Sequence, residues 1–328
     1  MDSTKPKISI VMPVRNGDAW LNETFRTILS QSRFDQTEII VIDSGSTDQS
    51  LSIIEKYPVR LFTIEHAEFN HGTTRNLGVR NARGEFVVMI VQDAKPIGRQ
   101  WLEFLLEPFE DDEVMAVCGQ QVVPHDADKN PMQWYRPVAG PSVKKYCFSA
   151  RETFEHLSPV EKRRVCGWDN VNAMYRRDAL LKIPFREIDF GEDMQWAKDA
   201  LESGYCLAHT GFAQVEHYHN NSDSSNYVRQ FAEDFQLYKM FGIVPELHGW
   251  NGKVVLKDIK WFLTENEVSL ADKWRWLRYN HMLRRSSRHS TQHFLIALAR
   301  GESALEEEYQ KLKPSNSQPL KPGMASAR

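Results

Sequence analysis

Short apolar runs alternate with helical segments through the first half of the chain. Runs rich in β-branched residues occupy Lys7–Val14, Glu38–Asp43, Val59–Ile64 and Glu85–Val91. The stretches between them place apolar residues at helical spacing, as in 20–29. Strands this short and this apolar are typical of a parallel sheet connected by crossover helices. The alternation therefore predicts an α/β fold whose ligand sites lie at the carboxyl ends of the strands.

Length, charge and cysteine content limit the class of protein. The 328 residues favour about two domains. The 41 Lys and Arg residues against 44 Asp and Glu residues give a net charge of −3, so no basic field favours nucleic acid. No run reaches the roughly 18 apolar residues of a spanning helix, and the N-terminal segment lacks a signal peptide's apolar block, so we expect a cytoplasmic protein. The scattered cysteines predict reduced thiols: Cys118, Cys147, Cys166 and Cys206.

The residue composition changes along the chain. The segment 119–166 is rich in Pro and polar residues and is expected to be irregular, and 173–181 is expected to be helical. Aromatic-rich helical segments begin near residue 227. We therefore expect a first domain over 1–222, a C-terminal helical region over 223–313 and a disordered tail over 314–328.

Two aspartates follow strands that end at the same edge of the predicted sheet. Asp43 precedes Ser44 and Gly45, where a carboxylate can accept a hydrogen bond from a nucleobase, but an ordinary strand-to-helix turn explains the same residues. Asp93 closes the most apolar strand. A buried carboxylate is costly unless it binds something, and Mg²⁺ or Mn²⁺ prefers carboxylate oxygens. A metal site at Asp93 is therefore favoured over a simple turn cap.

Charged residues also begin two predicted helices. Arg75 lies in the first turns of a helix that starts near His71, where a phosphate can bind, although a surface arginine fits equally well. Glu192 and Asp193 begin a second helix. The helix dipole alone explains two carboxylates there, whereas the functional interpretation makes one of them a general base toward a hydroxyl.

Two histidines alternate at the end of a later predicted strand. His217 and His219 would point to one face if they continue that strand. Most single histidines are structural, so they are candidate ligands only because Asp93 needs partners.

Six segments, taken in order, resemble an inverting family-2 glycosyltransferase. They are PVRNG (13–17), DSGSTDQS (43–50), FNHGTTRNLGVRNARG (69–84), IVQDAKP (90–96), GED (191–193) and EHYH (216–219). The resemblance covers 7–220 and implies a GT-A fold, which is a Rossmann-like, mostly parallel sheet with helices on both faces, here with a C-terminal helical region added. HGTTRN, QDA and GQQVVP are most similar to bacterial rhamnosyltransferase-like enzymes, which build O-antigen, capsule or cell-wall polysaccharides from dTDP-L-rhamnose.

The resemblance implies a role for each matching position. Asp193 would be the base and Glu192 would support it or orient the acceptor. Asp93 would bind Mg²⁺ or Mn²⁺ and the diphosphate, with His217 as a second metal ligand. The acceptor, a saccharide or polyprenyl-linked saccharide, would meet Trp168, Asp169, Asn170 and His219. The nucleotide-sugar donor would be held by Pro13, Val14, Arg15, Asp43, Ser44, Gly45, His71, Arg75, Gln92 and Asp93.

Other functions stay open beside this one. The family's usual metal motif is Asp-x-Asp, whereas Gln92-Asp93-Ala94 offers one carboxylate, and Gln120 stands where relatives more often carry Arg. A UDP-hexose donor is therefore an alternative, and so is a nucleotide- or carbohydrate-binding module without turnover. A dehydrogenase is disfavoured because no GxGxxG follows the first strand, and a nucleotidyltransferase because PVRNG lacks lysine and glycine density.

A basic, tryptophan-bearing segment lies in the C-terminal region. From Lys273 to Arg288 the chain has six basic residues and no acidic one. Such a helix can settle on an anionic membrane, here the inner face of the cell membrane, which would suit a polyprenyl-linked acceptor. A solvated helix that packs its tryptophans against the catalytic domain is the alternative.

Overall fold

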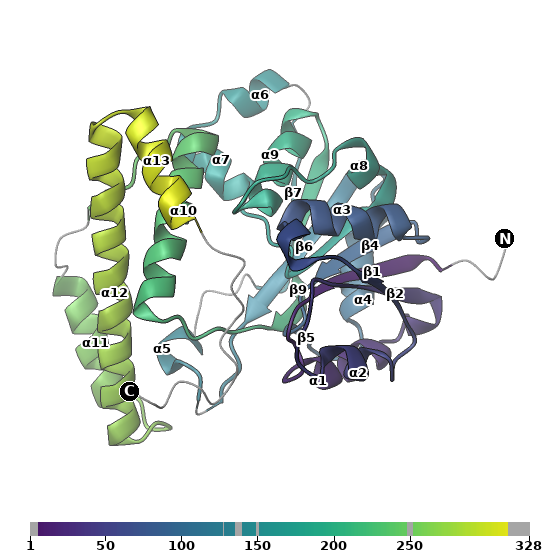
Figure 1. Ribbon diagram of the computed structural model, residues 1–328, viewed down its shortest axis with the longest axis horizontal. Coiled ribbons are helices and arrows are strands. Elements are labelled where there is room, and N and C mark those ends of the chain that lie inside the picture. The colour runs from purple at the N-terminus through teal and green to yellow at the C-terminus, as the bar shows by residue number, and fades with distance from the viewer. Residues whose placement is uncertain (1–5, 127, 135–139, 149–150, 248–251, 314–328) are drawn as a thin grey trace. The chain divides into compact units, whose positions relative to one another are not determined.

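The computed structural model describes residues 6–126, 128–134, 140–148, 151–247 and 252–313 (Figure 1). The chain forms two compact units. One contains the described residues within 1–122 and 137–217, and the other contains those within 123–136 and 218–320. The division expected at residue 222 remains a prediction, and the tail expected over 314–328 lies outside the described residues.

The first unit is built on a mixed sheet with the strand order β3-β2-β1-β4-β8-β6-β9-β5, and β7 pairs with β9. The first four of these strands are parallel, as predicted, whereas β8 runs antiparallel to both β4 and β6. The strands are β1 (Ile8–Val14), β2 (Thr37–Asp43), β3 (Val59–Thr63), β4 (Phe86–Ile90), β5 (Lys95–Pro96), β6 (Val114–Val122), β7 (Val143–Tyr146), β8 (Asn172–Arg176) and β9 (Cys206–Glu216).

Helices cover both faces of this sheet (Figure 1). Ile10 and Met12 of β1 share a buried cluster with Phe25, because alternate residues of a strand point to the same face. Val11 points to the other face, where α3 lies so close that a Cβ at Gly78 would come within 2.3 Å of it. The helices of this unit are α1 (Leu21–Leu29), α2 (Ser50–Ile54), α3 (His71–Asn81), α4 (Trp101–Leu106), α6 (Arg151–Glu155), α7 (Pro159–Val165), α8 (Arg177–Lys182) and α9 (Glu192–Glu202).

Local structure differs from the sequence pattern at two places in this unit. The segment expected to be helical over 173–181 is helical only from Arg177 on, as α8; its first part is strand β8, because pairing with β4 and β6 on both sides buries Ala173, Met174 and Tyr175. β9 ends at Glu216, so His217 does not continue the strand.

The thiol prediction is wrong for two of the four cysteines. Cys147 and Cys206 form a disulfide, while Cys118 and Cys166 are buried free thiols. β7 and β9 pair antiparallel with Tyr146 opposite Leu207. Cys147, which follows Tyr146, therefore lies opposite Cys206, the first residue of β9. Their separation of 59 residues gives no local sign of this pairing.

The second unit is helical. It contains α5 (Pro131–Trp134), α10 (Asp223–Phe241), α11 (Gly252–Thr264), α12 (Leu270–Ala299) and α13 (Glu302–Leu312). α10 packs along α12 through Phe231 and Phe294, whose ring centroids are 5.9 Å apart, and Ser290 Oγ donates to Tyr227 O at 2.8 Å. Among the described residues, no helix has both the length and the apolarity to cross a bilayer.

Candidate active site

The parallel strands β1, β2 and β4 bring most of the predicted donor-binding residues to one edge of the sheet. Val14 pairs with Asp43 at the carboxyl ends of β1 and β2, next to Pro13. Ser44 is buried there and donates its backbone N–H to Val14 O at 2.9 Å. The edge predicted from the strand pattern is therefore the place where these side chains meet.

Gln92 fixes the loop that follows β1. Its Oε1 accepts from Arg15 N at 2.9 Å, and its Nε2 donates to Arg15 O at 3.1 Å. A Cβ at Gly17 would lie 2.7 Å from the same Oε1, so a larger residue there would have to displace the Gln92 amide. The Arg15 side chain lies beside His66, with Nη1 and Nε2 2.8 Å apart. Gln92 thus holds the backbone on which Arg15 is presented.

Asp43 organises the turn after β2. Its Oδ2 accepts from the backbone N–H groups of Gly45 and Ser46 at 3.0 Å each, and the Ser46 hydroxyl donates to Oδ1. Gly45 has φ +81°, which a residue with a Cβ rarely adopts. The structure therefore accounts for Asp43 as a turn carboxylate, and its contact with a nucleobase stays a prediction.

Asp93 and His217 lie together at the same edge. His217 Nε2 is 3.7 Å from Asp93 Oδ1, and both side chains are nearly buried, at 12% and 7% exposure. His217 Nδ1 lies 2.6 Å from Gln121 Oε1. Because that amide oxygen can only accept, Nδ1 carries a proton, and in the neutral ring Nε2 is then the nitrogen with a lone pair.

This arrangement suits a divalent cation. A carboxylate oxygen and an imidazole nitrogen are ligands that Mg²⁺ and Mn²⁺ accept. A histidine whose other ring nitrogen is held by a neighbouring oxygen is the usual form of a metal-ligating histidine. Gln121 in turn donates its amide to Asp169, so the metal candidates are joined to the next group of residues.

Glu192 and Arg75 form a buried ion pair. Arg75 lies in α3 and Glu192 is the first residue of α9, and their side chains are 5% and 7% exposed. Burial by itself would raise the pKa of Glu192, but the Arg75 guanidinium and further donors hold it below its usual value. Arg75 is thus engaged with Glu192, and contact of Arg75 with a phosphate stays a prediction.

His71 lies at the exposed start of the same helix. The N-cap side chain of Asn70 accepts from Gly72 N at 2.9 Å and from Thr73 N at 3.2 Å. The first N–H groups of α3 already have an acceptor, so the proposed anion contact of His71 is a prediction as well.

Asp193 occupies the next position of α9. Its Oδ2 accepts from Asn170 N at 3.2 Å and its Oδ1 from Met194 N at 2.7 Å. Burial and the negative charges of Glu192 and Asp169 raise the pKa of Asp193 to about 8. A carboxylate with a pKa near the working pH is a far better proton acceptor than an ordinary one. The position, the fixed orientation and the raised pKa all suit a general base.

Asn170 connects the two acidic residues to the aromatic core. Its Oδ1 accepts from Tyr175 OH, which accepts from Trp168 Nε1 at 2.7 Å, and its Nδ2 donates to Glu192 at 3.4 Å. Trp168 is 5% exposed and Asn170 1%. This burial favours a positioning role for both residues, while the contact with an acceptor remains a prediction. Asp169 accepts from Val171 N at 2.8 Å, and His219 belongs to the second unit.

The sequence alone does not identify Gln121 and Tyr175 as residues of the site. Gln121 is one of two adjacent glutamines at the end of β6, and Tyr175 reads as a core residue of β8. Their partners His217 and Asn170 are separated from them by 96 and 5 residues. The GQQVVP segment could have pointed to Gln121, whereas no pattern in the sequence marks Tyr175.

Residues 9–183 match the family model described as glycosyl transferase family 2. The O-antigen chain rhamnosyltransferase WbaN of Salmonella anatum is 31% identical over 233 residues, which are 69% of this chain and 70% of that protein. The chain belongs to glycosyl transferase family 2. It is therefore a glycosyltransferase, as the six segments suggested. A second relative, the O-antigen chain rhamnosyltransferase RfbN of Salmonella typhimurium, is 29% identical with the same coverage.

Solved structures confirm the fold class. The mannosyltransferase PcManGT from Pyrobaculum calidifontis, solved with GDP-Man and Mn²⁺, aligns with a TM-score of 0.51 at 18% identity, covering 94% of this chain and 81% of that one. Residues 1–349 of S. aureus TarS align with a TM-score of 0.50 at 15% identity, covering 94% and 90%. The chain thus has the expected fold, which is a GT-A fold followed by a helical region.

Proposed function

We propose that this glycosyltransferase moves L-rhamnose from dTDP-L-rhamnose to a hydroxyl of a growing bacterial surface polysaccharide or lipid-linked saccharide, with inversion. The relatives named as O-antigen chain rhamnosyltransferases support the choice of sugar and acceptor class. The observation that carries the chemistry is Asp193, a carboxylate of raised pKa held by two backbone N–H groups at the start of α9.

Asp193 acts as the base in a single displacement. It takes the proton of the acceptor hydroxyl as that oxygen bonds to the anomeric carbon, and the bond from that carbon to the nucleotide diphosphate breaks. The nucleoside diphosphate leaves with the electron pair on the opposite face of the sugar. One displacement inverts the anomeric centre, so a β-linked donor gives an α-linked product. Glu192 stays ionised beside Arg75 and keeps the start of α9 in place.

Asp93 and His217 would hold the divalent cation. When bound, it supplies positive charge to the diphosphate of the donor. Gln121 keeps the His217 ring in the orientation and tautomer that a metal needs. Pro13, Val14, Arg15, Ser44 and Gly45 frame the nucleotide side of the same edge.

A polyprenyl-linked acceptor would place the enzyme at the inner face of the cell membrane, with Lys273–Arg288 as the contact. No role in nucleic-acid binding is proposed, because the net charge is −3.

Calorimetric titration with dTDP and UDP, each with and without Mn²⁺, tests the donor. Binding of dTDP that is tighter than that of UDP and that needs Mn²⁺ supports rhamnose and the Asp93 site together. Preference for UDP keeps the reaction and replaces the donor with a UDP-hexose. Failure to bind either nucleotide favours a non-catalytic carbohydrate- or nucleotide-binding module.

A further inference from the structure

Helix α11 has apolar residues on two faces. One face packs on α12: Lys273 Nζ donates to Phe262 O at 2.9 Å, and the rings of Phe262 and Trp274 lie 5.1 Å apart. The other face exposes Leu256, Ile259 and Leu263 at 66%, 50% and 72%. Their spacing of three and four residues places them on one line along the helix. We call these three residues the outer stripe.

Lysines flank the outer stripe. Lys253, Lys257 and Lys260 are exposed and fall beside it on the helix. The single acidic residue of α11, Asp258, faces α12 and pairs with Arg284. A helix with an exposed apolar line and lysines next to it is the pattern of a helix that lies in a membrane interface, where lysine amines reach lipid phosphates.

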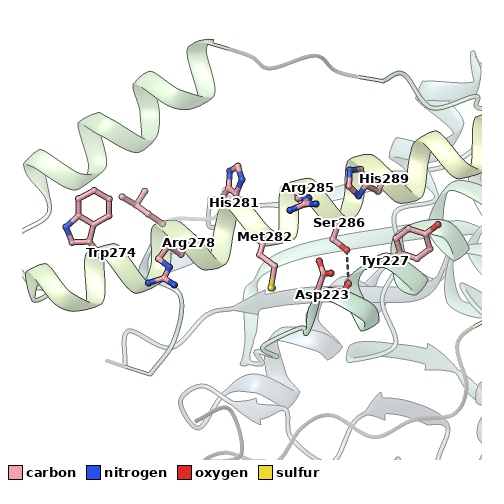
Figure 2. Close-up of a pocket in the computed structure, with 10 residues that line it drawn as sticks. Asp223, Tyr227, Trp274, Arg278, His281, Met282, Arg285, Ser286 and His289 are labelled. Carbon is pink, nitrogen blue, oxygen red and sulfur yellow. Dashed lines mark hydrogen bonds between the residues drawn. The ribbon is translucent and has the colours of Figure 1, made fainter. Parts of the chain in front are cut away.

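A basic groove lies beside α12 in the same unit (Figure 2). It encloses about 640 Å³ between α12 and the start of α10. Arg278, His281 and Arg285 come from one face of α12 at helical spacing, and Asp223 is the one acidic residue among the described residues that line it. Trp274 also lines the groove, is 61% exposed and contacts Phe262 of α11, so it joins the groove to the α11–α12 hairpin.

We propose that the α11–α12 hairpin docks on a bilayer that contains anionic phospholipid. The outer stripe and Trp274 enter the acyl boundary, and Arg278 and Arg285 bind lipid phosphates in the groove. Charge complementarity selects this occupant, because Arg278 and Arg285 line the groove and three exposed lysines lie beside the outer stripe. The role of such docking in the reaction rests on the lipid-linked acceptor proposed above, whereas the docking itself is measured without any acceptor.

Co-sedimentation of the full chain with vesicles tests the proposal. One set is phosphatidylcholine alone, and the other includes roughly 30 mol% phosphatidylglycerol. We expect binding to the anionic vesicles only, reduced severalfold when salt rises from about 0.05 M to about 0.5 M. The Trp fluorescence should shift to the blue on binding, and Trp274→Phe should remove most of that shift.

Three variants divide the proposal into its parts. Replacing the outer stripe (Leu256→Ser, Ile259→Ser, Leu263→Ser) should lower vesicle affinity at least about tenfold. Arg278→Gln with Arg285→Gln should weaken binding to anionic vesicles and flatten the salt dependence. The matched control replaces exposed apolar residues of the first unit, Ile97→Ser with Leu181→Ser, and should bind as the parent does. Thermal unfolding shows that each variant is folded.

Equal vesicle binding by the parent and the outer-stripe variant overturns the proposal, as does absence of binding at low salt. A parent chain that ignores vesicles but dimerises through the outer stripe also overturns it and assigns the stripe to a protein interface. The nucleotide titration above is a separate measurement, so failure of docking and failure of the donor assignment are told apart.

Discussion

Arg75 and Glu192 join the starts of α3 and α9 through an ion pair that is almost fully buried. The two residues are separated by 117 positions in the chain. Because removal of one partner leaves an uncompensated buried charge, Arg75→Met should lower the free energy of unfolding by about 3–5 kcal/mol. Urea unfolding monitored by circular dichroism measures this loss.

The double variant Arg75→Met with Glu192→Leu is the control for that prediction. It removes both charges, so it should be closer to the parent in stability than Arg75→Met alone. If the two single variants, Arg75→Met and Glu192→Leu, lose amounts of unfolding free energy that add up to the loss in the double variant, the two side chains do not interact as the structure indicates.

Asp193→Asn should strongly slow the transfer reaction without unfolding the protein. The amide fills the same space but cannot take a proton, so the rate should fall by about 10²–10⁴. Initial rates of nucleoside diphosphate release with donor and acceptor measure this. Glu202→Gln, on the same helix but at its far end, should retain the parent rate. Full turnover by Asp193→Asn would remove the base assignment.

The same Asp193→Asn change should stabilise the fold at and above neutral pH. The pKa of Asp193 is raised from 3.8 to about 8 in the folded chain. The stability that this group contributes is therefore complete below the unfolded pKa and is lost as pH rises toward 8. We expect the variant to exceed the parent by about 1 kcal/mol or more at pH 8 and to match it near pH 4. Denaturant unfolding at both pH values tests the sign.

The pH dependence of the reaction rate should reflect the raised pKa of Asp193. Only the ionised carboxylate accepts a proton, so kcat/KM should climb with pH and level off above about 8. Buffers that overlap across this range, with stability checked at each pH, separate the titration from unfolding. A profile already flat from pH 5 would show that Asp193 is ionised throughout and that its surroundings do not raise its pKa.

Gln121→Leu should weaken metal binding although Gln121 is not proposed as a ligand. Loss of its Oε1 releases His217 Nδ1, so the ring can adopt the wrong tautomer and orientation. Mn²⁺ affinity, measured by calorimetry on the full chain, should fall about 10–100-fold. Gln214→Leu on β9 should leave it unchanged, and Asp93→Asn should remove it. Unchanged affinity in Gln121→Leu would contradict the proposed metal site.

The Cys147–Cys206 disulfide should stabilise the first unit. Reduction, or the double change Cys147→Ser with Cys206→Ser, should cost about 2–4 kcal/mol, because the bond closes a long loop of the unfolded chain. Thermal unfolding with and without reductant measures the effect. The double variant serves as the control, since its midpoint should not respond to reductant.

Features with a local cause could be predicted from the residues alone. Alternation of short apolar runs with helical spacing predicted the parallel strands β1, β2 and β4, and the parallel arrangement brought Val14 and Asp43 to one edge. The order of the six segments indicated the glycosyltransferase family, which the comparisons confirm. Periodicity and motif order need no knowledge of distant contacts, and that is why they could be read from the chain.

The pairing of distant groups became visible in the folded chain. It placed Arg75 against Glu192, where the sequence suggested a phosphate, and it joined Cys147 to Cys206, where the sequence suggested free thiols. It also made the first part of the expected helix over 173–181 into strand β8, while the rest is helix α8. Each of these outcomes depends on partners that are distant in the sequence. Local propensity and residue spacing contain no information about such partners. The pKa of Asp193 has the same origin, since burial and two carboxylates brought together by folding set it.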